Sequence, residues 1–271
     1  MTSYFGKCPA VIGKEQRMPK PAEDNTQFYQ DTAMDYETLL ELAKKRRSCR
    51  RFKPGSIPDD CVDKIIEVAR WAPSGANSQP WEFIVIKDDE LKGKIVGVIK
   101  DLQHLNFKIE LTRPKALRYP GQTMPVAEYG YEKAPVFILV CGDTRTKDAY
   151  PLYEAADAGQ TVFDSSLAIA MLYMHLVATT LGLGSQWITA SRAWSVQCIV
   201  RELLAIPKEL EIYDMMAVGK VVSDPPPRLV RSKDEIVHYD KYDMRKFRTE
   251  QEISNFIAAI RKHRTYSGMG R

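Results

Sequence analysis

The sequence has little that would suggest a disulfide framework or a zinc site. Its five cysteines are scattered and odd in number, and none of them forms a CxxC pair or has metal-ligand spacing. This pattern favours reduced thiols in a cytoplasmic protein. The N-terminal stretch MTSYFGKCPAVIGKEQRMPKP contains no long apolar run, so we expect no export signal.

The sequence also lacks an internal repeat and an excess of charge. With 39 basic and 35 acidic residues, the net charge of +4 is too small for a general attraction to nucleic acid, so any basic site must be local. One segment, residues 166–184, approaches the length of a membrane span, but it contains His175 and two threonines and has no flanking basic clusters. We therefore expect a buried core helix, and neither a membrane nor a nucleic-acid partner.

Hydrophobic periodicity predicts a fold of mixed helices and strands. Short runs rich in β-branched and aromatic residues predict strands at residues 81–87, 135–141, 185–189 and 215–222. Helices are expected after the N-caps Asp35 and Asp59, at residues 154–181 and at residues 250–263. Because these elements do not alternate at the spacing of βαβ units, the predicted class is α+β, a mostly antiparallel central sheet flanked by helices.

The two ends of this pattern suggest its domain organisation. Residues 1–34 are rich in Pro, Lys, Gln and Asp without a period, which predicts an extended N-terminal arm. Residues 35–271 then form a single domain. Within it, residues 88–134 combine helix-like segments with the irregular stretch RPKALRYPGQTMP, which predicts a lid over an active site.

A run of six cations, KKRRSCRRF at residues 44–52, is the first candidate for binding chemistry. Guanidinium groups match phosphate oxygens in pairs, and the Ser48 hydroxyl can add a donor. A solvated basic face explains the run equally well. Nucleic-acid binding would need further basic stripes with interleaved aromatic residues, which the chain does not show.

A second candidate is the loop APSGANSQPW, which joins a predicted helix to a predicted strand. Pro73 and Pro80 fix two φ angles, and Gly75 allows the backbone to approach a ligand closely. Four polar side chains supply donors and acceptors that suit the rim of a flat heterocycle: Ser74, Asn77, Ser78 and Gln79. A rigid helix-to-strand connection remains an alternative.

The third candidate, LGLGSQWITA at residues 181–190, ends the apolar helix with a glycine stop and leads into a strand. A plain helix-to-strand turn explains the glycines but not Thr189. In their order and spacing the three motifs resemble those of the nitroreductase-like flavoprotein family, over about residues 36–242. The resemblance implies a sandwich that dimerises through its long buried helix and holds one FMN per subunit at the dimer interface.

The resemblance also implies which residues contact FMN. The isoalloxazine loop matches at Pro73, Ser74, Gly75 and Asn77; the phosphate and ribityl segment at Arg46, Arg47, Ser48, Cys49 and Arg50; the strand end beside flavin N5 at Trp187, Ile188, Thr189 and Ala190; and the arginine after the last strand at Arg231, with Arg228 as a weaker candidate. We expect Cys49 to pack. Whether the Thr189 hydroxyl or a backbone amide reaches N5 stays open, because many family members have glycine there.

The function implied by the resemblance is NAD(P)H-dependent reduction of nitroaromatic, quinone or related conjugated acceptors by ping-pong hydride transfer. No catalytic side chain is required, and His104 and His175 are expected at the surface and in the core. One alternative is a reductive dehalogenase of the iodotyrosine deiodinase type, which shares the RRS-x-R and APSGA motifs. Another is a non-catalytic flavin-binding protein.

Overall fold

The computed structural model describes residues 35–115, 118, 130–225 and 228–266, with only the backbone for residues 261–266. The predicted arm, residues 1–34, lies outside the described residues. The chain divides into two units, residues 1–40 and 41–271, and helix α1 (Tyr36–Lys45) begins in the first and ends in the second. Asp35 is the N-cap of α1, as the sequence predicts, because its Oδ1 accepts a hydrogen bond from the Thr38 amide at 2.7 Å.

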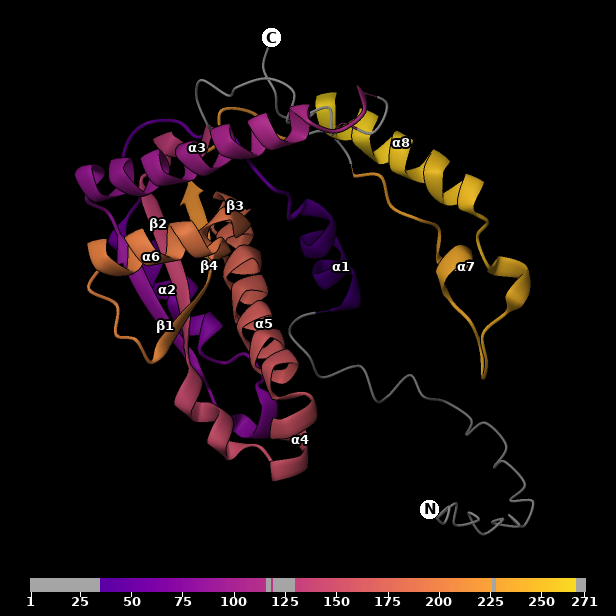
Figure 1. Cartoon of the computed structure of the whole chain (residues 1–271), viewed down its shortest axis with the longest axis horizontal. Coiled ribbons are helices and arrows are strands. Elements are labelled where there is room, and N and C mark those ends of the chain that lie inside the picture. The colour runs from indigo at the N-terminus through magenta and orange to yellow at the C-terminus, as the bar shows by residue number, and fades with distance from the viewer. Residues whose placement is uncertain (1–34, 116–117, 119–129, 226–227, 267–271) are drawn as a thin grey trace. The chain divides into compact units, whose positions relative to one another are not determined.

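A four-stranded sheet forms the centre of the second unit (Figure 1). Its strands are β1 (Trp81–Ile86), β2 (Val136–Asp143), β3 (Gly184–Ile188) and β4 (Leu210–Gly219), in the order β1-β2-β4-β3 with every neighbour antiparallel. This confirms the predicted class and all four strands. β4 begins five residues before the predicted start, because Glu211 and Asp214 interrupt the apolar pattern there.

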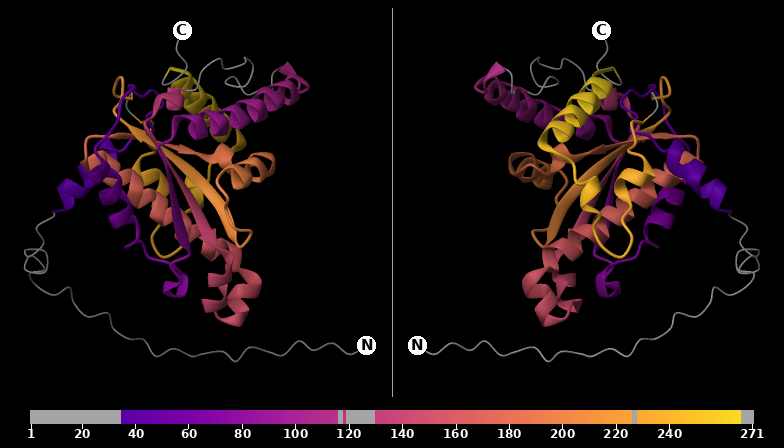
Figure 2. Two further views of the ribbon diagram at one scale, coloured as in Figure 1. Left: turned by 90° about the vertical axis from the view of Figure 1, so that its left-hand side faces the viewer. Right: turned by 90° about the vertical axis from the view of Figure 1, so that its right-hand side faces the viewer.

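The sheet is covered on both faces because its strands are apolar on both sides. Along β2, Phe137 and Leu139 enter one core while Ile138 and Val140 enter the other. Helices α3 (Asp89–Leu111) and α6 (Trp194–Leu203) contribute to the first core. Helices α2 (Asp59–Ala69) and α5 (Gly159–Thr180) cover the opposite face (Figure 2).

Helix α5 is the long apolar helix that the sequence predicts. Its length and its mean hydropathy of 1.4 would allow it to cross a membrane. The core helix of a globular protein meets the same two criteria. Phe163, Leu167 and Met171 are fully buried in the second core. The prediction of one helix over residues 154–181 is wrong at its start: Ala158, with φ −129° and ψ 3°, separates α5 from the short helix α4 (Leu152–Asp157).

The region predicted as a lid divides into two parts. Its first half is the regular helix α3, whose Ile95, Val96 and Ile99 are buried, so the N-terminal part of this helix belongs to the first core. Most of the irregular stretch, residues 116–117 and 119–129, lies outside the described residues, where the lid stays a prediction.

The remaining elements are short except for the last. Helix α7 (Lys233–Ile236) and helix α8 (Glu250–Tyr266) follow the sheet, and α8 confirms the predicted terminal helix. Asp59 is not the N-cap of α2; Pro58 holds that position and Asp59 is the first helical residue. Short 3₁₀ turns lie at Gly75–Asn77, Gly130–Lys133, Thr144–Ala149, Thr189–Arg192 and Met244–Lys246.

Candidate functional site

The loop between α2 and β1 has a strained backbone. Ala76, Asn77 and Gln79 have φ values of 50°, 53° and 42°, a region that residues other than glycine rarely adopt. The Ser74 hydroxyl accepts a hydrogen bond from the Gln79 amide at 3.0 Å, which closes the loop on itself. Strain of this kind persists only where surrounding contacts impose it, and it is concentrated at functional sites.

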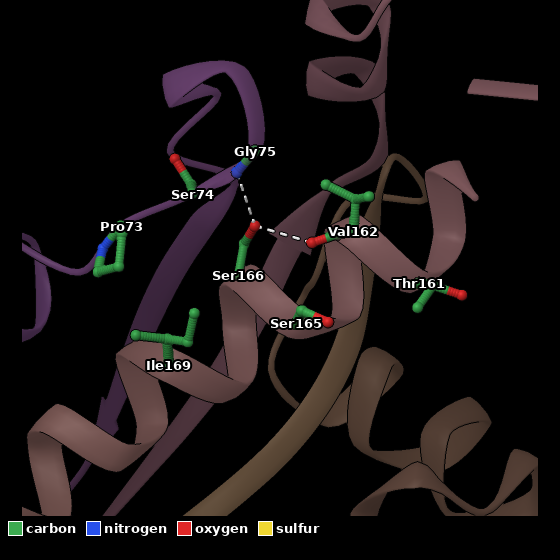
Figure 3. A pocket seen from close by; sticks show the side chains of 8 residues that line it. All are labelled: Pro73, Ser74, Gly75, Thr161, Val162, Ser165, Ser166 and Ile169. Carbon is green, nitrogen blue, oxygen red and sulfur yellow. Dashed lines mark hydrogen bonds between the residues drawn. The ribbon is translucent and has the colours of Figure 1, made fainter. Parts of the chain in front are cut away.

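Helix α5 supplies those surrounding contacts (Figure 3). The Ser166 hydroxyl accepts from the Gly75 amide at 3.2 Å and donates to the Val162 carbonyl at 2.8 Å. A Cβ at Gly75 would collide with the Val162 side chain. Gly75 is therefore needed for close packing against α5, while the ligand approach that the sequence suggests stays a prediction.

A cavity of about 250 Å³ lies between this loop and α5 (Figure 3). Pro73, Ser74 and Gly75 line it from the loop, and Thr161, Ser165 and Ile169 line it from the helix. The loop thus presents the predicted positions 73–75 to an open space. Asn77 is exposed beside them.

The basic segment lies along the outer edge of β3. Ser48 forms a parallel β-bridge with Ser185, and the Cys49 amide donates to the Ser185 carbonyl at 2.8 Å. Farther along, Phe52 bridges to Val221. Backbone pairing with a sheet edge therefore fixes the direction of the residues on either side of the Ser48–Cys49 pair.

The Cys49 side chain packs in the first core, as the sequence predicts. Its thiol is buried in the first core, and burial raises its pKa. A Cβ at Gly184 would lie 2.9 Å from Cys49 Sγ, so the two segments are in close contact. The Cys49 side chain is consequently part of the first core.

Three arginines gather beside this edge. Burial lowers the pKa of Arg46, and the positive charges of Arg228 and Arg47 lower it further. Burial and the charge of Arg228 likewise lower the pKa of Arg47. In the part of the chain that the structure describes, none of the three forms an ion pair with a carboxylate. A partly buried cationic cluster without a counter-ion fits a phosphate group.

The two arginines after the last strand occupy different positions. Arg228, the weaker candidate from the sequence, lies near Arg46 and Arg47. Arg231, the preferred candidate, donates instead to the Glu235 carbonyl at 3.0 Å. The reason is local: Ser232 and Glu235 form the capping box of α7, which places Glu235 against Arg231. Arg50, also predicted, is half-buried, with its carbonyl oxygen against Gly130.

The end of β3 points its side chains inward. Ile188 is buried in the first core, and the Trp187 indole stacks on His175 at 5.6 Å between ring centroids. The Ile188 side chain is thus part of the core, and the Trp187 indole is partly buried. Thr189 and Ala190 open the 3₁₀ turn, and the Thr189 hydroxyl is exposed without a hydrogen bond to any described residue.

His175 is a core residue, as the sequence indicates. It is 2% exposed, its Nδ1 lies 2.6 Å from the Ser185 hydroxyl, and burial, with a smaller effect of Arg46, lowers its pKa to about 3. The sequence analysis missed Asp214, a buried carboxylate in β4. A lone acid in the otherwise apolar run IYDMMAV was the signal that could have found it.

The loop and the basic segment connect to helix α5 at different residues. The loop is bonded to Ser166 of α5, while the basic segment connects through Ser185 to His175, nine residues later on the same helix. Nine residues correspond to about 13 Å along a helix axis. The loop and the basic segment therefore connect to different parts of α5.

Residues 43–220 match the family model described as the Nitroreductase family. The chain belongs to the nitroreductase family. The predicted resemblance is confirmed over most of the length for which it was expected, including the basic segment, the loop and the end of β3.

Individual relatives differ in what they are named for. The chain is 36% identical over 116 residues to iodotyrosine deiodinase 1 of Rattus norvegicus, a match covering 41% of this chain and only 39% of the rat protein. It is 29% identical over 184 residues to a putative NADH dehydrogenase/NAD(P)H nitroreductase of Archaeoglobus fulgidus, covering 68% of this chain and 85% of that protein.

A solved structure shares the fold. Iodotyrosine deiodinase bound to FMN and 3-iodo-L-tyrosine superimposes with a TM-score of 0.59 and 29% identity, covering 75% of this chain and all of the other. The architecture of the described sheet and helices is thus that of a nitroreductase-fold flavoprotein.

Proposed function

We propose that this member of the nitroreductase family is an FMN-dependent oxidoreductase that acts as a homodimer. The observation that carries the proposal is the cluster of Arg46, Arg47 and Arg228, which has no carboxylate partner among the described residues and lies at the edge of β3. FMN bound to a structural relative at 29% identity supports phosphate as its ligand.

Each segment has a distinct role in this proposal. The arginines bind the FMN phosphate by charge-assisted hydrogen bonds, and Ser48 adds a hydroxyl donor. The turn that begins at Thr189 and Ala190 faces flavin N5. FMN, when bound, supplies hydride transfer, while the protein holds the ring, excludes water and shapes the substrate pocket.

A second copy of the chain completes the site. Because Ser166 and His175 are nine residues apart on α5, the loop at Pro73–Asn77 of one copy is proposed to grip the flavin held by the arginines of the other. Apolar side chains support such an interface, since Leu172 of α5 is 43% exposed, Tyr239 is 79% exposed and Phe247 is 63% exposed. Surfaces of this kind are usually covered by a partner.

The proposed reductant is NAD(P)H, and the proposed acceptors are nitroaromatic, quinone or related conjugated compounds. The printed name of the archaeal relative supports this reaction. Reductive dehalogenation of an iodotyrosine is a second candidate, supported by the rat relative and by the 3-iodo-L-tyrosine complex. The four described cysteines are all free, which supports the proposed cytoplasmic location.

The proposal is tested on protein purified without added flavin. We expect a yellow protein that releases FMN on denaturation, identified by mass spectrometry. Steady-state consumption of NADH or NADPH with a nitroaromatic or quinone separates an enzyme from a non-catalytic flavin binder. Release of iodide from 3-iodo-L-tyrosine by the chemically reduced protein would favour the second candidate. A colourless protein that cannot be reconstituted with micromolar FMN would overturn the cofactor assignment.

A further inference from the structure

A buried carboxylate lies directly beneath the turn that follows β3. Asp214 is 2% exposed, its Oδ2 accepts from Trp187 Nε1 at 2.7 Å, and its Oδ1 is buried without a hydrogen-bond partner. The residue sits at an irregularity of β4, where the register with β2 pairs Val140 with Asp214 but Cys141 with Ile212. This β-bulge leaves Tyr213 unpaired and re-aims the side chains on either side of it.

The bulge contacts both ends of the turn Thr189–Arg192. Trp187, two residues before Thr189, is bonded to Asp214. Arg192, at the end of the turn, places its guanidinium 4.2 Å from the centre of the Tyr213 ring. Between them, the buried Ser191 hydroxyl donates to the Ile188 carbonyl at 2.9 Å. Tyr213 and Asp214 therefore anchor the turn from both sides.

The charge of Asp214 is not needed for structure alone. An asparagine oxygen could also accept the Trp187 hydrogen bond, without placing a charge in the core, but that bond would no longer be charge-assisted. Burial is the main cause that raises the pKa of Asp214 from 3.8 to about 6. The hydrogen bond from Trp187 and the charge of Arg192 lower this pKa, whereas the charge of Asp164 raises it. The carboxylate is thus held in a position that disfavours its charge, which is typical of functional sites.

We propose that Asp214 is a positioning residue, which through Trp187 and Arg192 sets the geometry of the turn that carries Thr189 and Ala190. The inference rests on the proposed function, in which this turn faces flavin N5. Other charged groups around the carboxylate are Arg192 from the turn and Asp164 from α5, which form an ion pair at 3.4 Å. His175, stacked on Trp187, is neutral at physiological pH because burial lowers its pKa to about 3.

The test uses the full-length protein with its flavin and the variants Asp214→Asn and Trp187→Phe. Hydrogen exchange of the peptide spanning residues 184–192 is followed by mass spectrometry at pH 7.5. Each variant is expected to raise exchange roughly tenfold, because Asp214→Asn removes the charge from this hydrogen bond and Trp187→Phe removes its donor. The double variant should show no further increase over Trp187→Phe, because both changes act on the same contact. Glu211→Gln, an acid-to-amide change on the same strand without a bond to Trp187, is the control and should leave exchange unchanged.

Two further measurements separate positioning from a merely structural role. In wild type, the rate at which NADH or NADPH reduces the bound flavin should fall as the pH is lowered through about 6, whereas Asp214→Asn should show no such transition. Resistance to urea at pH 8 should be unchanged or higher in Asp214→Asn. Loss of urea resistance in proportion to the faster exchange would make Asp214 a structural residue and overturn the inference.

The outcomes also distinguish this inference from the proposed function. A protein that binds no FMN would refute the proposed function, while hydrogen exchange would still decide whether Asp214 holds the turn. A protein that binds FMN, with identical exchange and identical pH profiles in wild type and Asp214→Asn, would refute the inference and leave the proposed function intact.

Discussion

The two segments predicted to contact FMN, residues 46–52 and residues 73–79, are held in place in different ways. The basic segment takes its direction from backbone pairing with the edge of a sheet at Ser185. The loop instead combines a strained backbone at Ala76, Asn77 and Gln79 with a hydrogen bond to Ser166 of α5 and packing against the same helix. A change in the loop should therefore act on conformation first, and a change in the basic segment should act on binding first.

The largest expected effect concerns Asp214 of β4, in the sheet whose edge holds the basic segment. The pKa of Asp214 is raised in the fold, so its contribution to stability is present below its ordinary pKa of 3.8 and is lost as the pH rises through about 6. A rise of this size corresponds to at most about 3 kcal/mol. Between pH 4 and pH 7, wild type should lose this stability relative to Asp214→Asn. Urea unfolding at both pH values measures it; parallel pH profiles for the two proteins would contradict the prediction.

The second effect concerns the arginines. Arg46→Ala should remove one charge-assisted phosphate contact of roughly 1.5 to 3 kcal/mol, weakening FMN binding by about ten- to a hundredfold with little change in unfolding. Fluorescence titration of the apoprotein with FMN measures this. Arg228→Ala should behave similarly, but Arg231→Ala should weaken binding less, because Arg231 is engaged with Glu235. A larger effect at Arg231 would restore the placement predicted from sequence.

The third effect concerns the loop. Gly75→Ala should lower the free energy of unfolding by roughly 1 to 3 kcal/mol, the usual range for overpacking, because its Cβ would collide with Val162. Gly93→Ala is the matched control: nothing lies within 4 Å of its new Cβ, and α3 should gain about 0.5 to 1 kcal/mol. Equal stability of the two variants would show that the loop can move away from α5.

The smallest effect is expected from removing the Ser166 hydroxyl, which is bonded to the loop. Ser166→Ala should cost about 1 kcal/mol, since it deletes the acceptor of the Gly75 amide. FMN binding should weaken only if the loop contacts the flavin. Thr180→Ala removes a comparable helix hydroxyl, bonded to the Val177 carbonyl but remote from the loop, and should change neither quantity. Equal flavin affinity in both variants would remove the loop from the proposed site.

Some features of the site were readable from the residues because they depend on neighbours in the chain. The basic run, the proline–glycine loop and the glycine stop before β3 are local patterns, and their family order located all three segments. Other features depend on residues far apart in sequence. Ser48 pairs with Ser185, and Gly75 packs against Val162, so neither contact leaves a local pattern. The contact of Arg231 with Glu235 is, by contrast, local, and the spacing of Ser232 and Glu235 in RSKDE is the sequence signal of the capping box that produces it.

The residues alone establish the class of fold and the candidate binding segments. The unbroken apolar run of β2 and the largely apolar helix α5 indicate elements that are buried on more than one side, and their burial largely settles the architecture. The contact of Asp214 with Trp187, just before the turn at Thr189, depends instead on a β-bulge that shifts the register of β4. The attachment of the loop and of the basic segment to different parts of α5 likewise depends on contacts between distant residues. The physical reason is that apolar patterning specifies which surfaces are buried, whereas register and long-range contacts specify which side chains meet there.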